Sequence, residues 1–147
     1  MDTSSGNAST LLVVERTAHK SLPLILAREF ASNLATPLVI MDENGTIVFF
    51  NEPAERIIGQ TAAEFGNLPE REWRARFSAE RLDGSPVGNE ELPHAVARRT
   101  RQPTHDTLVI EQLEGQRRIL SVTVIPLLGR EDELVGLLAV FWEQPNE

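Results

Sequence analysis

The residues that could carry chemistry in this 147-residue chain are few and widely separated. Its three histidines, His19, His94 and His105, lack the spacing of a metal-binding triad. Two acidic clusters, at 90–91 and 131–133, fall where solvated turns are expected. The sequence has no glycine-rich phosphate loop and no Ser-His-Asp order. These patterns therefore predict neither a metal centre nor a catalytic site.

The composition narrows the class of protein further. The absence of cysteine excludes disulfides, thiolate metal sites and cysteine nucleophiles. A net charge of −8 opposes binding to nucleic acid or to an anionic membrane. The polar N-terminus lacks the basic start of a signal peptide, and no apolar run is long enough to span a bilayer. We therefore expect a cytoplasmic protein with one domain and one hydrophobic core.

The N-terminal part of the chain predicts a tail followed by an amphipathic helix. Residues 1–20 begin with a small, polar stretch and are interpreted as a flexible tail, and residues 144–147 as a short C-terminal one. The stretch "SLPLILAREFASNLA" (21–35) predicts a helix, because Ser21 suits an N-cap and Pro23 suits a first turn. Its apolar residues recur at helical spacing and form one stripe: Leu22, Ile25, Leu26, Phe30 and Leu34.

The stretch "TPLVIMDENGTIVFFNEPAERIIG" (36–59) predicts a β-hairpin followed at once by a helix. The strands are "LVIM" and "TIVFF", and Asn44 and Gly45 between them tolerate the positive φ of a tight turn. Asn51 suits the cap of the helix "EPAERII", and Gly59 suits its end. The hairpin and helix together predict one corner of a cup-shaped domain.

The rest of the chain divides into a helical middle and a strand-rich end. In the middle, "EREWRARF" places Trp73 and Phe77 on one helix face, and "NEELPHAVARRT" places Leu92 and Val96 one turn apart. Three strands then form a predicted meander, at residues 104–115, 116–129 and 133–143. The order after the leading helix is β-β-α-α-α-β-β-β.

This order, together with three loose motifs, resembles the PAS domain family over residues 36–143. The motifs are "PLVIMDENGTIVFFNEPAERIIG", "ELPHAVARRTRQP" and "EGQRRILSVTVIPLLGREDELVGLLAVFW". The resemblance implies an α+β fold: a five-stranded antiparallel sheet with helices on one face, here preceded by the N-terminal amphipathic helix. It also implies a non-enzymatic sensory or protein-interaction module, in which a small ligand or a partner changes the sheet.

The chain departs from the family pattern after the last predicted strand. Many members end that strand with an Asp-Ile-Thr-like triplet that leads into an output helix. This sequence reads "FWEQPNE", with Glu143 in the place of the Asp, and no kinase, cyclase or DNA-binding segment follows. The chain is then either an excised module or a stand-alone protein, and the methionine at position 1 favours the second.

By the resemblance, one face of the sheet packs on the helices and lines any cavity. Strand alternation and helix spacing assign these residues to the cavity: Val39, Met41, Leu92, Val96, Leu108, Ile110, Leu120, Val122, Val124, Leu137, Ala139 and Phe141. A wholly apolar set predicts a small apolar ligand, or a filled core in a pure interaction module. Flavin would need polar partners here, and the family's flavin and yellow photoactive branches both use a cysteine that this chain lacks.

Two further functions stay open from the sequence. The family's haem branch has a proximal histidine on its long helix, so His94 suggests a haem-binding gas or redox sensor. His94 lies beside Pro93 at the helix start, however, where a partly exposed histidine is the plainer interpretation, and His105 fits a solvated strand end. The other alternative is a small enzyme on a curved, cystatin-like sheet, which would need an ionisable pocket residue that the assigned set does not contain.

The opposite sheet face is also apolar, although a solvated face should be polar. The residues assigned to it are Leu38, Ile40, Ile47, Phe49, Leu138, Val140 and Trp142. A patch of this size is rarely left bare, so we predict that the N-terminal helix covers it and joins two copies as a homodimer. The predicted interface is Leu22, Ile25, Leu26, Phe30, Leu138, Val140 and Trp142. A signalling protein is a further possible partner, and a monomer whose helix folds back on its own sheet is the competing arrangement.

Overall fold

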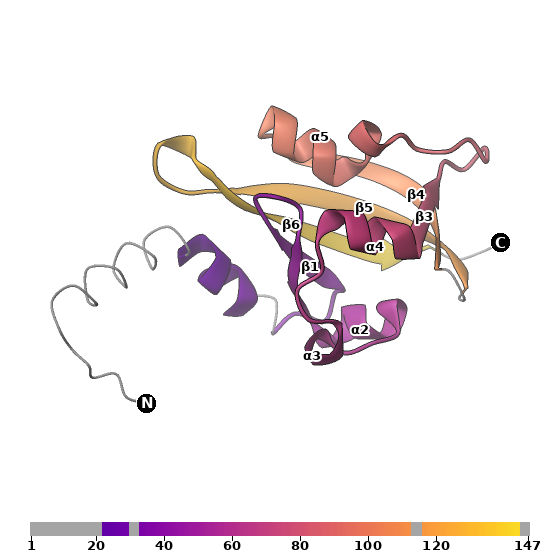
Figure 1. Cartoon of the computed structure of the whole chain (residues 1–147), viewed down its shortest axis with the longest axis horizontal. Coiled ribbons are helices and arrows are strands. Elements are labelled where there is room, and N and C mark those ends of the chain that lie inside the picture. The colour runs from indigo at the N-terminus through magenta and orange to yellow at the C-terminus, as the bar shows by residue number, and fades with distance from the viewer. Residues whose placement is uncertain (1–21, 30–32, 113–115, 145–147) are drawn as a thin grey trace, which may run out of the picture.

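The structure is a computed structural model that describes residues 22–29, 33–112 and 116–144 (Figure 1). Its strands are β1 (Leu38–Asp42), β2 (Ile47–Phe50), β3 (Phe77–Glu80), β4 (Thr104–Gln112), β5 (Arg117–Leu128) and β6 (Leu134–Glu143). Its helices are α2 (Glu52–Ile58), α3 (Ala62–Phe65), α4 (Glu70–Arg76) and α5 (Pro93–Thr100), with short 3₁₀ turns at Asn89–Glu91 and Arg130–Asp132. Residues 22–29 are also helical and are called the N-terminal helix below.

The strands form one antiparallel sheet in the order β2-β1-β6-β5-β4-β3. The α+β class predicted from the sequence is confirmed, but the sheet has six strands rather than five. The added strand is β3, which pairs along the edge of β4 with Ala79 opposite Ile110. It was missed because the sequence pattern was interpreted as helix through Phe77. Helix α4 ends at Arg76 instead, and the pairing that makes Phe77 extended involves a strand more than 25 residues away.

The turn between β1 and β2 is closed by the side chain of Asp42. Its Oδ1 accepts hydrogen bonds from the backbone N–H of Asn44 at 2.8 Å and of Thr46 at 3.0 Å. Gly45 has a φ of +84°, a conformation that glycine adopts without the cost that a side chain would add. The predicted hairpin is therefore observed with Gly45 in the role that the sequence indicated, and Asp42 adds closing contacts that were not predicted.

Asn51 joins the start of β1 to the start of α2. Its Oδ1 accepts from the backbone N–H of Ala54 at 3.2 Å, which caps the helix, and from that of Leu38 at 3.0 Å. Its Nδ2 donates to the carbonyl of Thr36 at 2.9 Å. The predicted cap is thus observed, and the same buried side chain also fixes the corner between strand and helix.

A β-bulge corrects one assignment made from strand alternation. Ile47 was predicted to lie on the outer sheet face with Phe49. The register shifts between Ile40 and Met41, so that Ile40 pairs with Phe49 but Met41 pairs with Ile47. The shift turns Ile47 to the inner face, where it is 6% exposed, because a bulge breaks the two-residue period on which the assignment relied.

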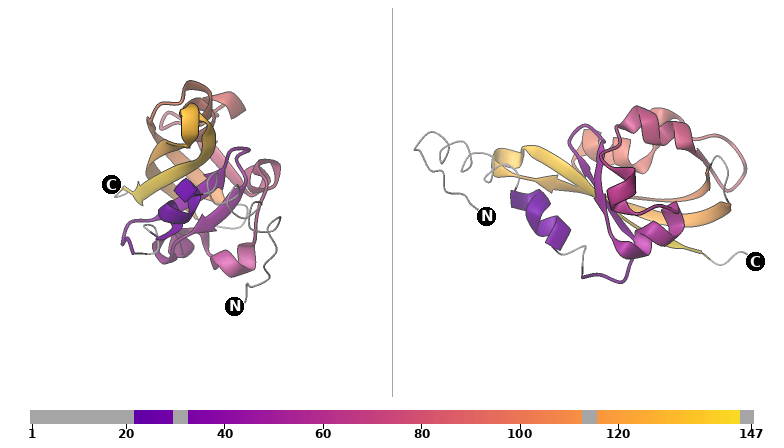
Figure 2. Two further views of the ribbon diagram at one scale, coloured as in Figure 1. Left: turned by 90° about the vertical axis from the view of Figure 1, so that its left-hand side faces the viewer. Right: turned by 60° about the horizontal axis from the view of Figure 1, so that its bottom comes forward.

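The sheet separates two hydrophobic clusters. The right-hand view of Figure 2 shows the N-terminal helix lying apart from helices α2 to α5. The inner cluster lies under helices α2, α4 and α5 and is built around Phe50, Val124 and Leu137. The outer cluster is built around Leu38, Ile40 and Leu138, with the N-terminal helix packed against them. One domain therefore uses both faces of the same central strands, β1 and β6.

The N-terminal helix is shorter than predicted and uses a different face. Helix was expected over 21–35, but 33–35 are not helical, and residues 21 and 30–32 lie outside the described part. Leu24 and Ala27 make the contact with the outer cluster. The predicted stripe residues Leu22, Ile25 and Leu26 are 49%, 47% and 58% exposed.

Gly136 lets the N-terminal helix approach the sheet closely. A Cβ at this position would lie 2.6 Å from Cδ2 of Leu24 and 2.7 Å from the carbonyl oxygen of Met41. The absence of a side chain at Gly136 therefore permits two close approaches, the docking of the N-terminal helix and the pairing of β1 with β6.

Two boundary predictions differ in the middle of the chain. The helix expected over 89–100 is a 3₁₀ turn at Asn89–Glu91 followed by α5, because Pro93 begins a new helix and Leu92 before it is extended. Among the described residues, no helix is both long and apolar enough to cross a membrane. The predicted tail 1–20 falls outside the described part.

Candidate functional site

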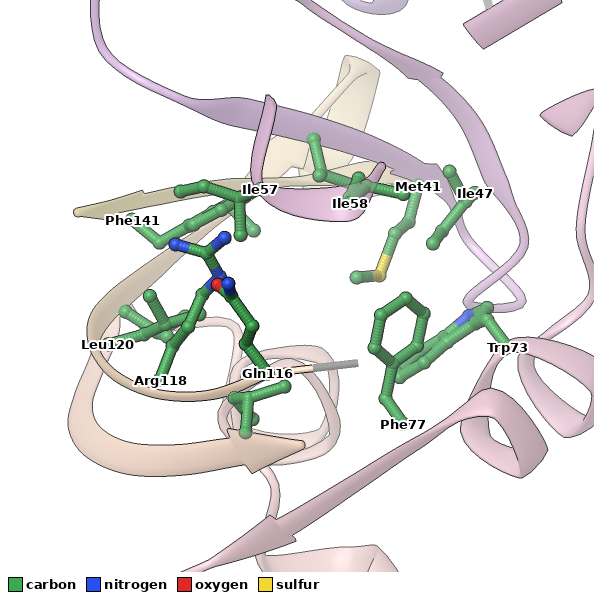
Figure 3. Close-up of a pocket in the computed structure, with 14 residues that line it drawn as sticks. Met41, Ile47, Ile57, Ile58, Trp73, Phe77, Gln116, Arg118, Leu120 and Phe141 are labelled. Atoms are coloured by element: carbon green, nitrogen blue, oxygen red, sulfur yellow. The ribbon is translucent and has the colours of Figure 1, made fainter. Parts of the chain in front are cut away.

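An apolar cavity lies between the inner sheet face and the helices. It encloses about 170 Å³. Its lining comprises Val39, Met41, Ile47, Ile57, Ile58, Trp73, Phe77, Ile110, Gln116, Arg118, Leu120, Val122, Ala139 and Phe141. Figure 3 shows Met41, Phe77 and Trp73 on one side of this space, and Arg118 and Gln116 beside each other on another.

Three kinds of element bring these side chains together. Strands β1, β4, β5 and β6 supply every second residue, because successive side chains point to opposite faces. The bulge in β1 and β2 adds Ile47. Helix α2 adds Ile57 and Ile58 from its last turn, while Trp73 on α4 and Phe77 at the start of β3 close the far side. The cavity is therefore bounded by the sheet on one side and by short helices on the other.

Trp73 ties the cavity wall to the β1–β2 turn. Its indole Nε1 donates to the carbonyl oxygen of Gly45 at 2.8 Å, while its ring lines the cavity. The edge of the His94 ring meets the Trp73 ring with 5.0 Å between the centroids and an interplanar angle of 63°. The polar atom of this large side chain is thus satisfied outside the cavity, which keeps the lining apolar.

Behind Trp73 lies a cluster of charged groups centred on Glu70. Oε2 of Glu70 lies 2.6 Å from Nε2 of His94, and Glu70 also lies near the guanidinium groups of Arg74 at 3.8 Å and Arg98 at 3.7 Å. Burial lowers the pKa of His94 below its usual value of 6.5, and the neighbouring arginines act in the same direction, whereas Glu70 opposes the shift. The interpretation of His94 as a partly exposed residue was wrong, since it is 4% exposed.

The position of His94 also decides whether it could bind a haem iron in the cavity. His94 does not line the cavity, because Trp73 does so instead, and its Nε2 is held by Glu70. Within the described part of the chain, no group of three or more His, Asp or Glu side chains is placed to hold a metal ion. His105, the other described histidine, is exposed and lies with Nδ1 2.9 Å from the hydroxyl of Thr123 on the outer face.

Arg118 and Gln116 are the polar residues of the lining. Arg118 pairs across the sheet with Ile110, another lining residue, so its stem follows the apolar wall. Nη1 of Arg118 donates to Oε1 of Glu143 at 2.7 Å, and its side chain is 24% exposed. A positive charge with one anionic partner therefore stands beside an otherwise apolar space.

Comparison with known proteins identifies the fold family. The family model described as PAS domain matches residues 35–143. The chain belongs to the PAS domain family. PAS domains are generally sensory or signalling modules. None of the curated proteins matches the chain.

Solved structures of other PAS domains share the fold at low sequence identity. The PAS domain of a Colwellia psychrerythraea protein is 14% identical, with 82% of this chain and 96% of that one covered and a TM-score of 0.59. The Rhodobacter sphaeroides LOV protein is 14% identical, with 85% and 69% covered and a TM-score of 0.64. The PAS domain of Bordetella pertussis BvgS is 18% identical, with 84% and 87% covered and a TM-score of 0.57. At these identities the likeness establishes the fold alone.

The PAS cavity contains part of the set predicted from the sequence. Seven predicted residues line it: Val39, Met41, Ile110, Leu120, Val122, Ala139 and Phe141. Val124 and Leu137 belong to the same core cluster without lining the space, and Leu108 is buried but does not line it. Leu92 and Val96 are half-buried and do not line it, because α5 buries its small residues Ala95 and Ala97 instead.

The remaining lining residues were not in the predicted set. Ile57, Ile58, Trp73 and Phe77 were missed because only the strands and one helix were used to assign the wall. Arg118 could have been found, since it shares the parity of Leu120 and Val122 on β5. It was omitted because only apolar residues were collected, although a long basic side chain can follow an apolar wall.

The predicted interface residues that the structure describes fall into three groups. Leu22, Ile25 and Leu26 are exposed on the N-terminal helix. Leu138 is buried and Val140 packs beside it under that helix. Trp142 is 44% exposed, with its ring 6.3 Å from that of His105. Phe30 lies outside the described residues.

Proposed function

We propose that this PAS domain is a non-enzymatic sensory module that binds a small, mainly apolar ligand in the cavity. The observation that carries the proposal is the cavity itself, about 170 Å³ of space with apolar walls apart from Arg118 and Gln116. An engineered apolar cavity of about 150 Å³ stays dry and admits benzene. The space therefore suits a group of roughly six to eight non-hydrogen atoms, which is much smaller than haem or flavin.

The strands that line the cavity also carry the N-terminal helix. On β1, Val39 and Met41 face the cavity, while Leu38 and Ile40, which alternate with them, face the outer cluster. A ligand that binds one arrangement of β1 and β6 better than another shifts the population toward it. The helix that rests on the outer side of the same strands would respond to that shift, which supports a route from ligand to surface.

Native mass spectrometry of the purified protein tests the ligand directly. The mass under native conditions is compared with the denatured mass, and the visible spectrum is recorded on the same sample. We expect an extra mass of a small organic molecule and no visible absorption band. A haem spectrum would contradict the proposal. A clean apo-protein that also fails to bind small apolar probes would favour an interaction module with no ligand.

We further propose that the N-terminal helix mediates self-association. Its inner side is already used by Leu24 and Ala27, yet its outer side leaves Leu22, Ile25 and Leu26 exposed. An apolar row on a short surface helix is costly to leave in water. A second copy of the chain fits this row, since a two-fold axis would bring the same residues together from both sides.

Analytical ultracentrifugation tests the association. The double variant Leu22→Glu/Leu26→Glu keeps the contacts of Leu24 and Ala27, so we expect a folded monomer where the unaltered chain is a dimer. Leu82→Glu is the matched control, because Leu82 is 65% exposed and far from the helix in sequence. A double variant that remains dimeric, or an unaltered chain that is monomeric at all concentrations, would contradict the dimer.

A further inference from the structure

The polar side of the cavity indicates which chemical class of ligand it would accept. Arg118 lies two residues from Gln116 along the chain, and the two side chains lie beside each other at the cavity (Figure 3). Apart from them, the described lining residues are apolar, and the Nε1 of Trp73 is used by Gly45. A ligand with one polar end can therefore satisfy that end only at Arg118 and Gln116.

The guanidinium of Arg118 has more N–H donors than its contact with Glu143 uses. An arginine side chain carries five N–H donors in a planar fork. One of its nitrogens, Nη1, bonds Glu143 at 2.7 Å, and Glu143 is the one partner that the described residues provide for this group. The remaining N–H groups can bind a second acceptor without breaking the Glu143 contact, and the amide of Gln116 adds two donors beside them.

The charges around Arg118 favour a ligand with one negative charge over a ligand with two. A carboxylate suits the fork of an arginine, and a hydrogen bond to a charged partner is roughly twice as strong as a neutral one. Glu143 already neutralises Arg118 in part, and the chain as a whole carries a net charge of −8. A dianion such as a phosphate monoester would therefore meet repulsion that a single carboxylate largely avoids.

We propose that the cavity binds a small monocarboxylic acid with a hydrocarbon body, whose carboxylate is held by Arg118 and Gln116. This inference rests on the proposed sensory function and names the ligand class of the same cavity. The hydrocarbon body occupies the space between Met41, Trp73 and Phe77, opposite Arg118. An amine of the same length brings a positive charge to Arg118, and an alcohol offers Arg118 an acceptor that carries no negative charge.

Tryptophan fluorescence gives a direct reading of the cavity. Trp73 lines it, whereas the other tryptophan, Trp142, lies on the outer face. A Trp142→Phe background therefore isolates the cavity signal. In this background, hexanoate, hexan-1-ol and hexylamine are titrated at pH 7.5. We expect hexanoate to bind about tenfold more tightly than hexan-1-ol, as the pairing of a carboxylate with a guanidinium allows, and hexylamine to bind more weakly than either.

Two arginine variants in the same background separate recognition from general charge. Arg118→Met should lower hexanoate affinity to about the level of hexan-1-ol and change hexan-1-ol affinity by only a few-fold, since the alcohol loses one hydrogen bond. Arg117→Met is the matched control, because Arg117 is the adjacent residue on β5 and pairs instead with Glu80 at 3.1 Å and Glu111 at 3.7 Å. It should leave the affinity for all three probes within about twofold, since exposed charges contribute little.

A third variant should increase the affinity for the carboxylate probe, which damage to the fold would not do. Glu143→Gln removes the anion that shares Arg118, so it should tighten hexanoate binding several-fold and leave hexan-1-ol binding nearly unchanged. Equal binding of hexanoate and hexan-1-ol by the unaltered cavity, or hexanoate binding that neither Arg118→Met nor Glu143→Gln changes, would overturn the carboxylate assignment while the cavity proposal stands. Failure of all three probes to alter Trp73 fluorescence would overturn both.

Discussion

The two faces of strands β1 and β6 are equally apolar but are packed in different ways. On the inner face, short helices leave about 170 Å³ unfilled between Trp73, Phe77 and the strands. On the outer face, Leu24 presses so closely against Gly136 that a Cβ there would lie 2.6 Å from it. The comparison shows that the pattern of apolar residues along a strand does not indicate whether its face is filled. That depends on how closely the covering helix can approach.

The largest expected effect comes from placing a methyl group in the tight face. In Gly136→Ala the new Cβ would lie 2.7 Å from the carbonyl oxygen of Met41, a backbone atom that cannot move aside easily. We expect a loss of about 2–3 kcal/mol in the free energy of unfolding, measured by urea denaturation. Gly88→Ala is the control, because Gly88 has a φ of −67° and its nearest neighbour is the flexible Glu91 side chain. A Gly136→Ala protein as stable as the Gly88→Ala protein would contradict the close packing.

A matched pair of substitutions compares the faces directly. Ala27→Leu adds three carbons to the filled outer contact, and Ala139→Leu adds the same three carbons to the cavity wall. We expect Ala27→Leu to cost about 1–2 kcal/mol by overpacking. Ala139→Leu should leave stability unchanged or raise it by up to about 1 kcal/mol, because the group enters empty space. Thermal unfolding of both variants measures the difference, and equal losses would mean that the inner face has no usable space.

The smallest effect is expected at the charged cluster behind Trp73. Burial lowers the pKa of His94 in the folded chain, so the unfolded chain binds the proton first as the pH falls. The stability is therefore fully present above pH 6.5, the usual His value, and is lost as the pH decreases through the folded-state pKa. One proton limits the slope to about 1.4 kcal/mol per pH unit.

Urea denaturation at pH 7.5 and at pH 5.5 measures this slope. Glu70, Arg74 and Arg98 face His94, so their charges are left in place and only the titrating ring is changed. His94→Gln should flatten the decrease in stability at low pH, because glutamine can keep a hydrogen bond to Glu70 without titrating. An unchanged slope in His94→Gln would show that other groups cause it.

The sequence predicts the local devices of this fold well. Gly45 and Asn51 act over at most 15 residues, in the turn and at the helix cap, and their residue types indicated those roles, whereas the closure of the turn by Asp42 was not predicted. The α+β class follows from the order of such elements. The strand faces were assigned correctly where the two-residue period continues, and Ile47 was misplaced where a bulge interrupts it.

The candidate site was less predictable, because its shape depends on contacts distant in sequence. Trp73 reaches Gly45 across 28 residues, and Glu70 reaches His94 across 24. Neither contact follows from periodicity, so His94 was taken as partly exposed and Trp73 was not placed in the wall. Strand β3 was missed for the same reason, since only the edge of β4 makes Phe77 extended. The N-terminal helix docks through a different face from the predicted one. Its docking depends on the small residues Ala27 and Gly136 rather than on the largest apolar residues of the helix.

The pairing of β1 with β6 has a consequence for synthesis on the ribosome. Leu38 pairs with Val140 and Asp42 pairs with Gly136, so the middle of the sheet joins segments that emerge about 100 residues apart. The β1–β2 hairpin and α2, tied together by Asn51, can form early from nearby residues. The edge of β1 that pairs with β6 then stays unpaired, and both apolar faces of the hairpin stay uncovered, until β6 has been translated. The sheet is therefore completed, and the N-terminal helix can dock on it, only when the nascent chain has extended past Glu143.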